Sequence, residues 1–472
     1  MKRSITFFKQ ACTATILAAF CAPLFIINAG PAADKKLTEE QKILHVLNRL
    51  GFGARPGDVE KVKAMGIQKY IDQQLDPSSI ADTVAEKKVE NLEIFKMSTD
   101  EVFAKYPNPG ALLRQLEGNM PAQNAEEMTD KQRQDRQQKL RSYYQKYDLR
   151  PAGQLQPQII ANRVLRDVYS ERQLQEVMVD FWQNHFNVFA GKAAVRWYIP
   201  SYERDVIRKN ALGNFRDLLL GTAQHPAMLF YLDNFESVAP NAQAANARPG
   251  QLQRLVQEGG LTPRVREQMK RQQGLTDAEI DQRIARIKTG AQNQQNRAKR
   301  GLNENYAREL MELHTMGVDS GYSQKDIVEV ARAFTGWTIA DPRGYRRIAA
   351  DEIKGTEGQR LARLQRMPGV PDNIESGQFY FNERWHDNGP KTILGQKVDE
   401  GGIKDGLKVI DILVKSPATA KFIARKLCVK FVNDNPDEAI VDRVAAAFSR
   451  SNGDIKTTLR AIFTDKEFFA PE

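Results

Sequence analysis

The sequence predicts an all-α fold, in which one large multi-helix domain carries a small β-ribbon and long polar insertions. Most segments repeat apolar residues at the spacing of one helix face, and Ser, Thr, Gly or Pro stands where such segments begin or end. Residues 378–395 instead combine short β-like runs with a turn rich in Asp, Asn, Gly and Pro. With 27% charged and 41% hydrophobic residues, the composition excludes a membrane bundle and a disordered chain.

The first thirty residues have the features of an export signal. Lys2, Arg3 and Lys9 precede a largely apolar run over residues 14–27, and small residues follow it. Because this run is short for a membrane span, we expect a cleaved signal peptide over residues 1–29, with a retained anchor as the alternative. The mature protein is then periplasmic or secreted and has no transmembrane segment.

Cysteine usage argues against a disulfide-stabilised protein, and the charge distribution argues against a nucleic-acid-binding protein. Cleavage leaves Cys428 as the one cysteine, so no internal disulfide forms, and its helical surroundings predict a buried, inert thiol. The formal charge is +10, and residues 241–300 hold twelve Lys or Arg against five acidic residues. This stretch is rich in Gln and Asn and poor in aromatics, which argues against a nucleic-acid-binding surface.

The same stretch determines the domain organisation. We expect residues 236–300 to form a basic Gln/Arg-rich insertion, either a solvated or mobile segment or an arm that touches anionic envelope polymers or lipid head groups. The insertion interrupts one domain. Its N-terminal helical part covers residues 38–235, and its C-terminal helical part, with the ribbon, covers residues 301–472.

Helix signals follow one another along both parts. The first helix has Thr38 as its N-cap, with Gln41 three residues later. The N-terminal helical segments stop or break at Gly51, Gly66, Ser170 and Pro226. In the C-terminal part, helices are predicted over 303–317, 323–337, 405–432, 437–450 and 453–469, and strands over 379–381 and 392–394.

Standard catalytic signatures are absent, since the chain has no GxSxG, HExxH, Walker or EF-hand motif. Seven other motifs occur in order: HVLNRLGFGARPGD, FWQNHFNVF, RWYIPSYERDVIRKNALGNFRDLLLGTAQHPAMLFYLDN, GLNENYARELMELHTMGVDSGYSQKD, RAFTGWT, FNERWHDNGPKTILG and FIARKLCVKFV. Together they closely resemble a bacterial family of exported proteins, the domain of unknown function numbered eighteen hundred. The resemblance covers about residues 42–469, except 236–300 and 341–376, and implies no mechanism.

The resemblance does imply a biological context. Genes of that family commonly neighbour those of a second exported family, numbered fifteen hundred and one, which resembles sulfatases and phosphatases. An exported sulfatase-like partner and a polysaccharide or envelope polymer as ligand are therefore expected, without a role for any particular residue.

The first group of candidate site residues lies on one predicted helix. Trp182 and His185 share a short motif, and His185 falls in the middle of an apolar stripe. It is therefore either a core histidine or the floor of a pocket. Trp182, Asn184 and Asn187 are candidates for substrate binding beside it.

The second group lies on the helix predicted over 303–317. His314 points inward, and Glu309 lies at the rim of the apolar sector, one turn after Asn305. Partial burial should raise the pKa of the Glu309 carboxyl, which suits a general acid. A structural salt bridge is the alternative for Glu309, and Asn305 is a candidate for substrate binding.

The third group is the ribbon motif, which contains Arg384, Trp385, His386 and Asp387. Loops on a rigid scaffold often carry function, so we expect His386 to be reachable by a ligand. Arg384 and Trp385 would bind substrate. The alternative is a turn in which Asp387 bonds its own backbone and Trp385 packs.

These residues leave two functions open. If the ribbon meets the helices, five candidate catalytic side chains share one cleft, as an acid/base pair or as a site for a divalent metal: His185, Glu309, His314, His386 and Asp387. We favour a hydrolase acting on envelope or extracellular polysaccharide, because tryptophan beside carboxylates suits sugar rings. The alternative is a non-enzymatic helical scaffold that binds a partner or polymer during export or envelope assembly.

Export with cleavage near Ala29 is the first testable prediction, because the charged start and the short apolar run end in small residues there. N-terminal sequencing of protein recovered from the periplasm or the medium should give a chain that begins at about residue 30. A membrane-bound product that retains Met1 would contradict it.

Overall fold

The computed structural model describes residues 37–118, 128–239, 301–318 and 320–470, together with isolated positions between 266 and 281. The expected signal peptide lies outside the described residues, as does nearly all of the expected insertion. The described part is mainly α-helical with two short β-ribbons, so the predicted all-α class is confirmed. None of its helices has the length and apolar character needed to cross a membrane.

The described α-helices fall into two groups, one before residue 240 and one after residue 300, and the strands all belong to the later part. The α-helices before residue 240 are α1 (Glu39–Leu50), α2 (Asp58–Met65), α3 (Ile67–Leu75), α4 (Thr83–Val89), α5 (Thr99–Lys105), α6 (Pro109–Glu117), α7 (Asp130–Lys146), α8 (Leu155–Tyr169), α9 (Gln173–His185), α10 (Val195–Tyr202), α11 (Phe215–Gln224) and α12 (Pro226–Tyr231). The later α-helices are α17 (Glu304–Glu312), α18 (Gln324–Ala333), α19 (Ile348–Ile353), α20 (Glu357–Gln365), α21 (Ile403–Lys415), α22 (Pro417–Phe431), α23 (Glu438–Arg450) and α24 (Ile455–Phe463). The strands are β1 (Trp337–Ile339), β2 (Phe379–Phe381), β3 (Lys391–Ile393) and β4 (Gln396–Val398).

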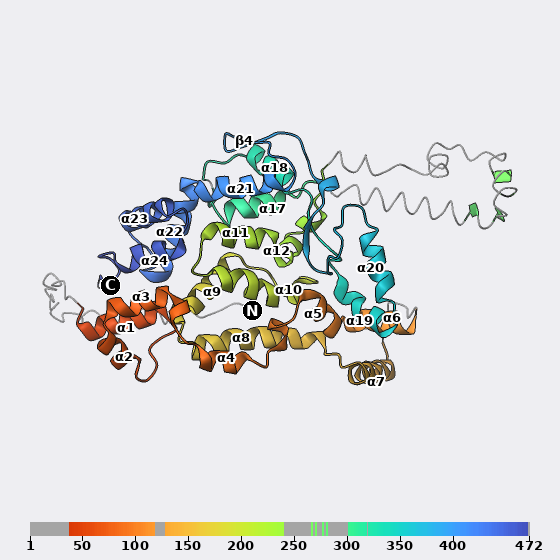
Figure 1. The fold of residues 1–472 in the computed structure, drawn as a ribbon, viewed down its shortest axis with the longest axis horizontal. Coiled ribbons are helices and arrows are strands. Elements are labelled where there is room, and N and C mark those ends of the chain that lie inside the picture. The colour runs from red at the N-terminus through yellow and green to blue at the C-terminus, as the bar shows by residue number, and fades with distance from the viewer. Residues whose placement is uncertain are drawn as a thin grey trace, which may run out of the picture.

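The helices stack in successive tiers (Figure 1). A pair formed by α4 and α8 lies at one edge, α9 and α10 come next, then α11 and α12, then α17, and α18 and α21 lie at the opposite edge. The group α22–α24 packs beside α1 and α3 at one end of the tiers, and α5, α6, α19 and α20 lie at the other end. One hydrophobic core, which runs from Ile43 to Phe468 along the chain, therefore joins segments from both sides of residues 240–300.

Local signals explain where the helices begin and end. Thr38 Oγ1 accepts a hydrogen bond from Gln41 N at 3.2 Å, and Gln41 Oε1 accepts one from Thr38 N at 2.8 Å, so the first turn of α1 has the expected capping box. The predicted breaks at Gly66, Ser170 and Pro226 separate α2 from α3, α8 from α9, and α11 from α12. Helix-terminating residues thus set these boundaries, as the sequence predicts.

The strands lie within one residue of the predicted positions, but they do not pair with each other. β2 pairs antiparallel with β1, and β3 pairs antiparallel with β4 through a tight turn at Leu394 and Gly395. Both turn residues have positive φ, 49° and 76°, as a two-residue hairpin of this hand requires. The segment between β2 and β3 bonds the helices instead of forming a hairpin turn, which separates the two strands.

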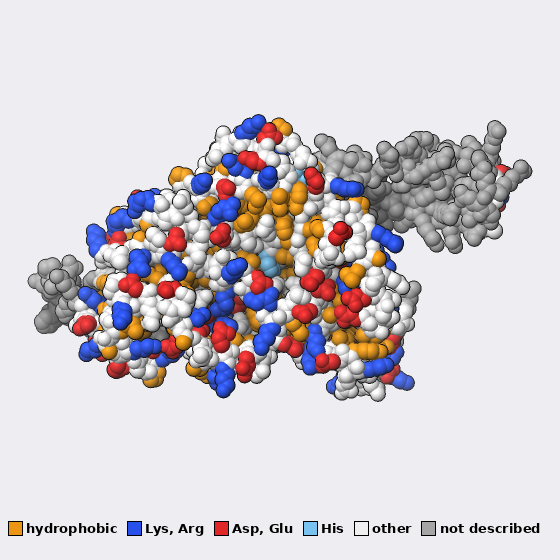
Figure 2. Space-filling view, in the orientation of Figure 1, with side chains coloured by type: hydrophobic (Ala, Val, Ile, Leu, Met, Phe, Trp, Pro, Cys, Tyr) orange, Lys and Arg blue, Asp and Glu red, His pale blue; other side chains and the backbone are white. Residues whose placement is uncertain are grey.

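Charged groups of both signs are interspersed over the visible face (Figure 2). A stripe of hydrophobic side chains crosses the middle of this face, where α12 and α17 lie in Figure 1. Leu313, which helical spacing places in the apolar sector, is 49% exposed because α17 ends at Glu312. Cys428 is buried, and burial raises the pKa of its thiol to about 12, which agrees with an inert cysteine.

Candidate functional site

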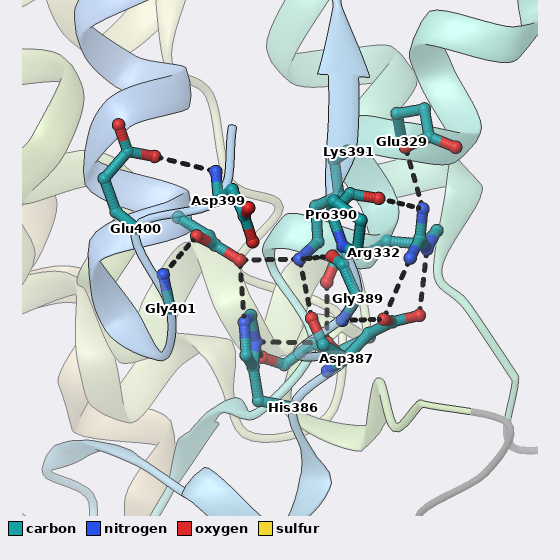
Figure 3. Close-up of polar contacts among 12 residues, drawn as sticks. Glu329, Arg332, His386, Asp387, Gly389, Pro390, Lys391, Asp399, Glu400 and Gly401 are labelled. Carbon is teal, nitrogen blue, oxygen red and sulfur yellow. Dashed lines mark hydrogen bonds and ion pairs between the residues drawn. The ribbon is translucent and has the colours of Figure 1, made fainter. Parts of the chain in front are cut away.

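The ribbon motif takes part in a buried ion cluster centred on Asp405 of α21 (Figure 3). Asp405 Oδ2 accepts hydrogen bonds from Lys391 Nζ at 2.6 Å and faces His386 Nε2 at 3.2 Å, and Asp405 Oδ1 accepts one from Gly401 N at 2.8 Å. The side chains of Asp405, Lys391 and His386 are at most 1% exposed. Burial acts to raise the pKa of the Asp405 carboxyl, but the hydrogen bond from Lys391 leads the effects that hold it below its ordinary value.

The ammonium group of Lys391 is fully used within this cluster. Besides Asp405, its Nζ donates to the backbone carbonyls of Asp387 at 2.6 Å and of Gly389 at 2.9 Å. Three N–H groups thus meet three acceptors. Lys391 therefore fixes the loop that leads into β3 from inside the molecule.

Asp387 extends the cluster to α18 (Figure 3). Its carboxylate binds Arg332 through two hydrogen bonds of 2.9 and 3.0 Å, and Arg332 Nη1 also binds Glu329 at 2.8 Å. Asp387 Oδ1 accepts a further hydrogen bond from Gly389 N at 2.9 Å, so the side chain bonds its own turn. Burial opposes ionisation of Asp387, but the Arg332 hydrogen bond keeps the pKa of its carboxyl low.

These contacts correct one expectation about the ribbon. His386 is not reachable by a ligand, because its side chain is 0% exposed, with Nδ1 2.9 Å from the Thr335 carbonyl oxygen and Nε2 at Asp405. The motif instead forms the turn that was the alternative, in which Asp387 bonds the backbone of its own turn. Trp385 packs against Val238 and Ala239.

The remaining ribbon candidate, Arg384, is exposed. It follows Asn382, whose side chain accepts a hydrogen bond from Arg384 N at 3.1 Å and so caps the short helix Glu383–Trp385. A substrate could reach the Arg384 side chain, although the buried His386 lies out of reach.

Two other predicted residues, His185 and His314, do meet. Their ring centroids lie 6.3 Å apart, and His185 Nε2 is 3.0 Å from the His314 carbonyl oxygen. Because a carbonyl oxygen can only accept, Nε2 carries the proton, and Nδ1 accepts a hydrogen bond from Lys426 Nζ at 3.0 Å. Burial lowers the pKa of His185 well below its ordinary value, and that of His314 to about 3, so both rings are neutral.

The other residues predicted on these two helices have separate surroundings. Trp182 is fully buried and donates from Nε1 to the Ala211 carbonyl at 3.0 Å. Asn184, which donates to the Asp180 carbonyl, and Asn187 and Asn305 are exposed.

Glu309 is half-buried, and burial, together with the Glu312 charge, raises the pKa of its carboxyl as expected. Among the described residues, no hydrogen bond or ring contact joins His386 or Asp387 to His185, His314 or the Glu309 side chain. The five candidate catalytic side chains thus do not form one bonded cluster.

A third polar cluster, which lies around a cavity of about 660 Å³, was not predicted from the sequence. Its lining comes from α4, from α8, from the segment between α4 and α5, and from the π-helix η4 (Glu203–Arg208). η4 directly continues α10, in which Pro200 supplies no N–H for the regular hydrogen-bond ladder. The residues that line the cavity are Thr83, Glu86, Lys87, Val89, Glu90, Leu92, Phe95, Lys96, Asn162, Arg166, Glu203, Arg204 and Arg208.

Glu203 is the most deeply buried charge at this cavity, with 0% of the residue exposed. Its Oε1 accepts from Asn162 Nδ2 at 2.7 Å and its Oε2 accepts from Gln183 Nε2 at 3.0 Å. Arg208 lies 3.4 Å from Glu203 Oε1 and binds both oxygens of Glu176 at 2.6 and 2.8 Å. The cavity is thus bounded by a buried, hydrogen-bonded ion network.

Asp167 of α8 lies beside the same network without a full set of partners. Its Oδ1 is buried and has no hydrogen bond among the described residues. Burial and then the Glu176 charge raise the pKa of the Asp167 carboxyl to about 7. A carboxyl that titrates near neutral pH next to buried ion pairs is typical of functional regions.

Sequence reasoning missed Glu203, Arg208 and Lys426, although all three lie in the quoted motifs. Glu203 and Arg208 are five residues apart, which puts them on different faces of an α-helix but brings them together in a π-helix. Lys426 lies next to Arg425 in a basic run, where the sequence does not distinguish a paired cation from an unpaired one. Within the described residues, no group of three or more His, Cys, Asp or Glu is placed to hold a metal ion.

Replacing His386 tests whether the ribbon cluster stabilises the fold. His386→Ala leaves the Thr335 carbonyl and Asp405 short of a partner, which should cost about 1 to 3 kcal/mol in the free energy of unfolding. Urea unfolding measures it, with the exposed Arg384→Ala as control, for which a change within about 0.5 kcal/mol is expected. Equal stability of the two variants would assign no structural role to His386.

Asp167→Asn tests the raised pKa. The Asp167 pKa is about 7 in the folded chain and close to its ordinary value of 3.8 when unfolded, so the folded state holds the proton more tightly. Wild-type stability from this group is therefore full below about pH 3.8 and is lost as the pH rises through about 7. The asparagine side chain of the variant cannot ionise. The melting temperature of Asp167→Asn should therefore rise relative to that of wild type as the pH increases over that range. A difference that does not change with pH would contradict the shift.

Comparison with known proteins identifies a family. The model of the family described as "Protein of unknown function (DUF1800)" matches residues 45–472. No curated protein and no solved structure matches the chain significantly.

Proposed function

This chain belongs to the DUF1800 family, and we propose that it is an exported hydrolase that binds an acidic polysaccharide of the envelope or the extracellular matrix in the cavity bounded by α4, α8 and η4. The cavity itself is the observation that carries the proposal. Its volume of about 660 Å³ falls within the range of roughly 300 to 1,000 Å³ that is common for ligand pockets.

The lining chemistry supports a hydroxyl-rich ligand. Thr83 and charged side chains of both signs offer donors and acceptors, and Phe95 offers an aromatic surface for the apolar face of a sugar ring. Such a mixture suits a polar polymer better than a purely apolar ligand.

The charge of the lining supports an acidic sugar. Arg166 pairs with Glu86, and Arg204 pairs with Asp205. Lys87 and Lys96 also line the cavity, and neither forms an ion pair within the part of the chain that the structure describes. Two free ammonium groups would bind the carboxylates or sulfates of an acidic polysaccharide.

Carboxylates in the same cavity support cleavage. Glu86, Glu90 and Glu203 all line it, and glycosidic hydrolysis ordinarily requires two carboxyl groups flanking the bond. We assign the catalytic carboxylate to Glu203, because, unlike the buried His386, it lines the cavity, and Asn162 and Gln183 hold it in one orientation.

The scaffold hypothesis remains the second candidate, because one observation favours it. Both oxygens of Glu203 already accept hydrogen bonds, an arrangement that suits binding without cleavage. In either case a sulfatase-like exported partner would act on charged groups of the same polymer.

Blocking the cavity tests the site. Thr83→Trp places a large side chain at the cavity wall, and it should abolish binding of alginate, an acidic polysaccharide, in affinity electrophoresis. Val84→Trp is the matched control, because Val84 follows on the same helix, is 54% exposed and does not line the cavity. Neutral dextran should bind neither variant nor wild type.

Reducing-end release from alginate distinguishes the two candidates. Glu203→Gln should retain binding and lower the hydrolysis rate by about 100- to 10,000-fold. Binding by wild type without any release supports the scaffold instead. If Thr83→Trp and Val84→Trp bind alginate equally well, the cavity is not the binding site of either candidate, the hydrolase or the scaffold.

A further inference from the structure

Lys426 of α22 is a basic side chain that has no anionic partner in the part of the chain that the structure describes. It is half-buried, and no carboxylate forms a hydrogen bond or ion pair with it among the described residues. Its neighbours on the same helix differ, since Lys421 pairs with Glu438 and Asp442, and Arg425 pairs with Glu438. On α22, Lys421 and Arg425 are thus paired with carboxylates, whereas Lys426 bonds a neutral histidine.

His185 fixes the direction of the Lys426 amine. Since His185 Nε2–H is committed to the His314 carbonyl, its Nδ1 is an acceptor and receives one N–H of Lys426 at 3.0 Å. A neutral amine held in this way donates one proton to the ring and keeps its lone pair free. The arrangement is typical of a positioned nucleophile.

One aromatic ring lies beside the Lys426 amine, and several surround its partner His185. Lys426 Nζ lies 5.1 Å from the ring centroid of Phe422, one turn earlier on α22. The rings of Phe181, Trp182, Phe186 and Phe422 all contact His185. Burial lowers the pKa of the Lys426 amine, so a larger share of it is uncharged near neutral pH.

We propose that Lys426, oriented by His185, is a nucleophilic amine that condenses with the carbonyl group of an apolar or aromatic aldehyde or ketone. The amine lone pair forms a C–N bond to the carbonyl carbon while the C=O π electrons move to oxygen. Proton transfer from nitrogen to oxygen gives the carbinolamine, which loses the hydroxyl and the remaining N–H proton as water. The product is an imine, and no oxidant or reductant is required.

This site is separate from the polysaccharide cavity. His185 bonds Lys426 of α22 and the carbonyl of His314, which follows the end of α17, whereas Gln183, two residues earlier on α9, bonds Glu203 at the cavity. The inference therefore does not depend on the proposed hydrolase, and either can fail alone.

Competitive labelling tests it on the full mature chain. Benzaldehyde with sodium cyanoborohydride at pH 7.5 traps each imine as a stable N-benzyl amine, and peptide mass spectrometry gives the initial rate at each lysine. Lys426 should react faster than Lys421, because burial lowers the pKa of the Lys426 amine whereas hydrogen bonds with Asp442 and Glu438 raise that of Lys421, so the uncharged fraction is larger at Lys426. Its rate should also level off at lower pH than the rate at Lys421.

Circular dichroism at each pH confirms that the chain is folded during labelling. Labelling of Lys426 at or below the rate of Lys421, or no labelling of Lys426 in the folded protein, would overturn the proposal. Preferential labelling with a pH profile shared by both lysines would also overturn it, since exposure alone would then explain the rate.

Discussion

The ion pair between Lys391 and Asp405 is the interaction on which the ribbon and its surroundings depend. Both side chains are at most 1% exposed, and a charge buried to this extent is stable only when it is paired and its remaining hydrogen-bonding capacity is used. Lys391 meets this requirement by taking two backbone carbonyls as well as Asp405. The loop between β2 and β3 is thereby shaped around an ammonium group, and His386 and Asp387 take their positions from it.

The requirement that buried charges be paired also distinguishes the three polar clusters, because they differ in whether a group remains for a ligand. The Asp405 cluster has its partners inside the protein, so it stabilises the fold and leaves no group for a ligand. The network at η4 is paired at Glu203 and Arg208, but it adjoins a cavity and includes Asp167, whose Oδ1 has no partner in the described structure. Among the described residues, the one hydrogen-bond acceptor of Lys426 is the neutral His185. Incomplete pairing therefore leaves groups for a ligand at the η4 network and at Lys426.

The sequence predicts features that neighbouring residues determine, such as helix boundaries, but not contacts between segments that are distant in the chain. Thr38 and Gln41, Gly66, Ser170 and Pro226 act within one or two turns, so the helix boundaries follow from them. The inward direction of His185 and His314 also follows from spacing, and both are buried. The burial of His386 depends on Asp405, 19 residues later, and no local pattern contains that contact. Glu203 and Arg208 escape notice because helical periodicity assumes α-helix geometry, whereas Pro200 precedes a π-helix in this chain.

Helix α9 explains how two separate sites can coexist in one core. On one side, Glu176 and Gln183 bond Arg208 and Glu203 at the cavity. On the other, His185 binds Lys426 and the His314 carbonyl. Trp182, which directly precedes Gln183, is fully buried, with its indole N–H held by the Ala211 carbonyl. A rigid, tightly packed helix keeps the neutral histidine and the ion network on opposite faces, so burial lowers the pKa of Lys426 on one face while Glu203 stays in the field of Arg208 on the other.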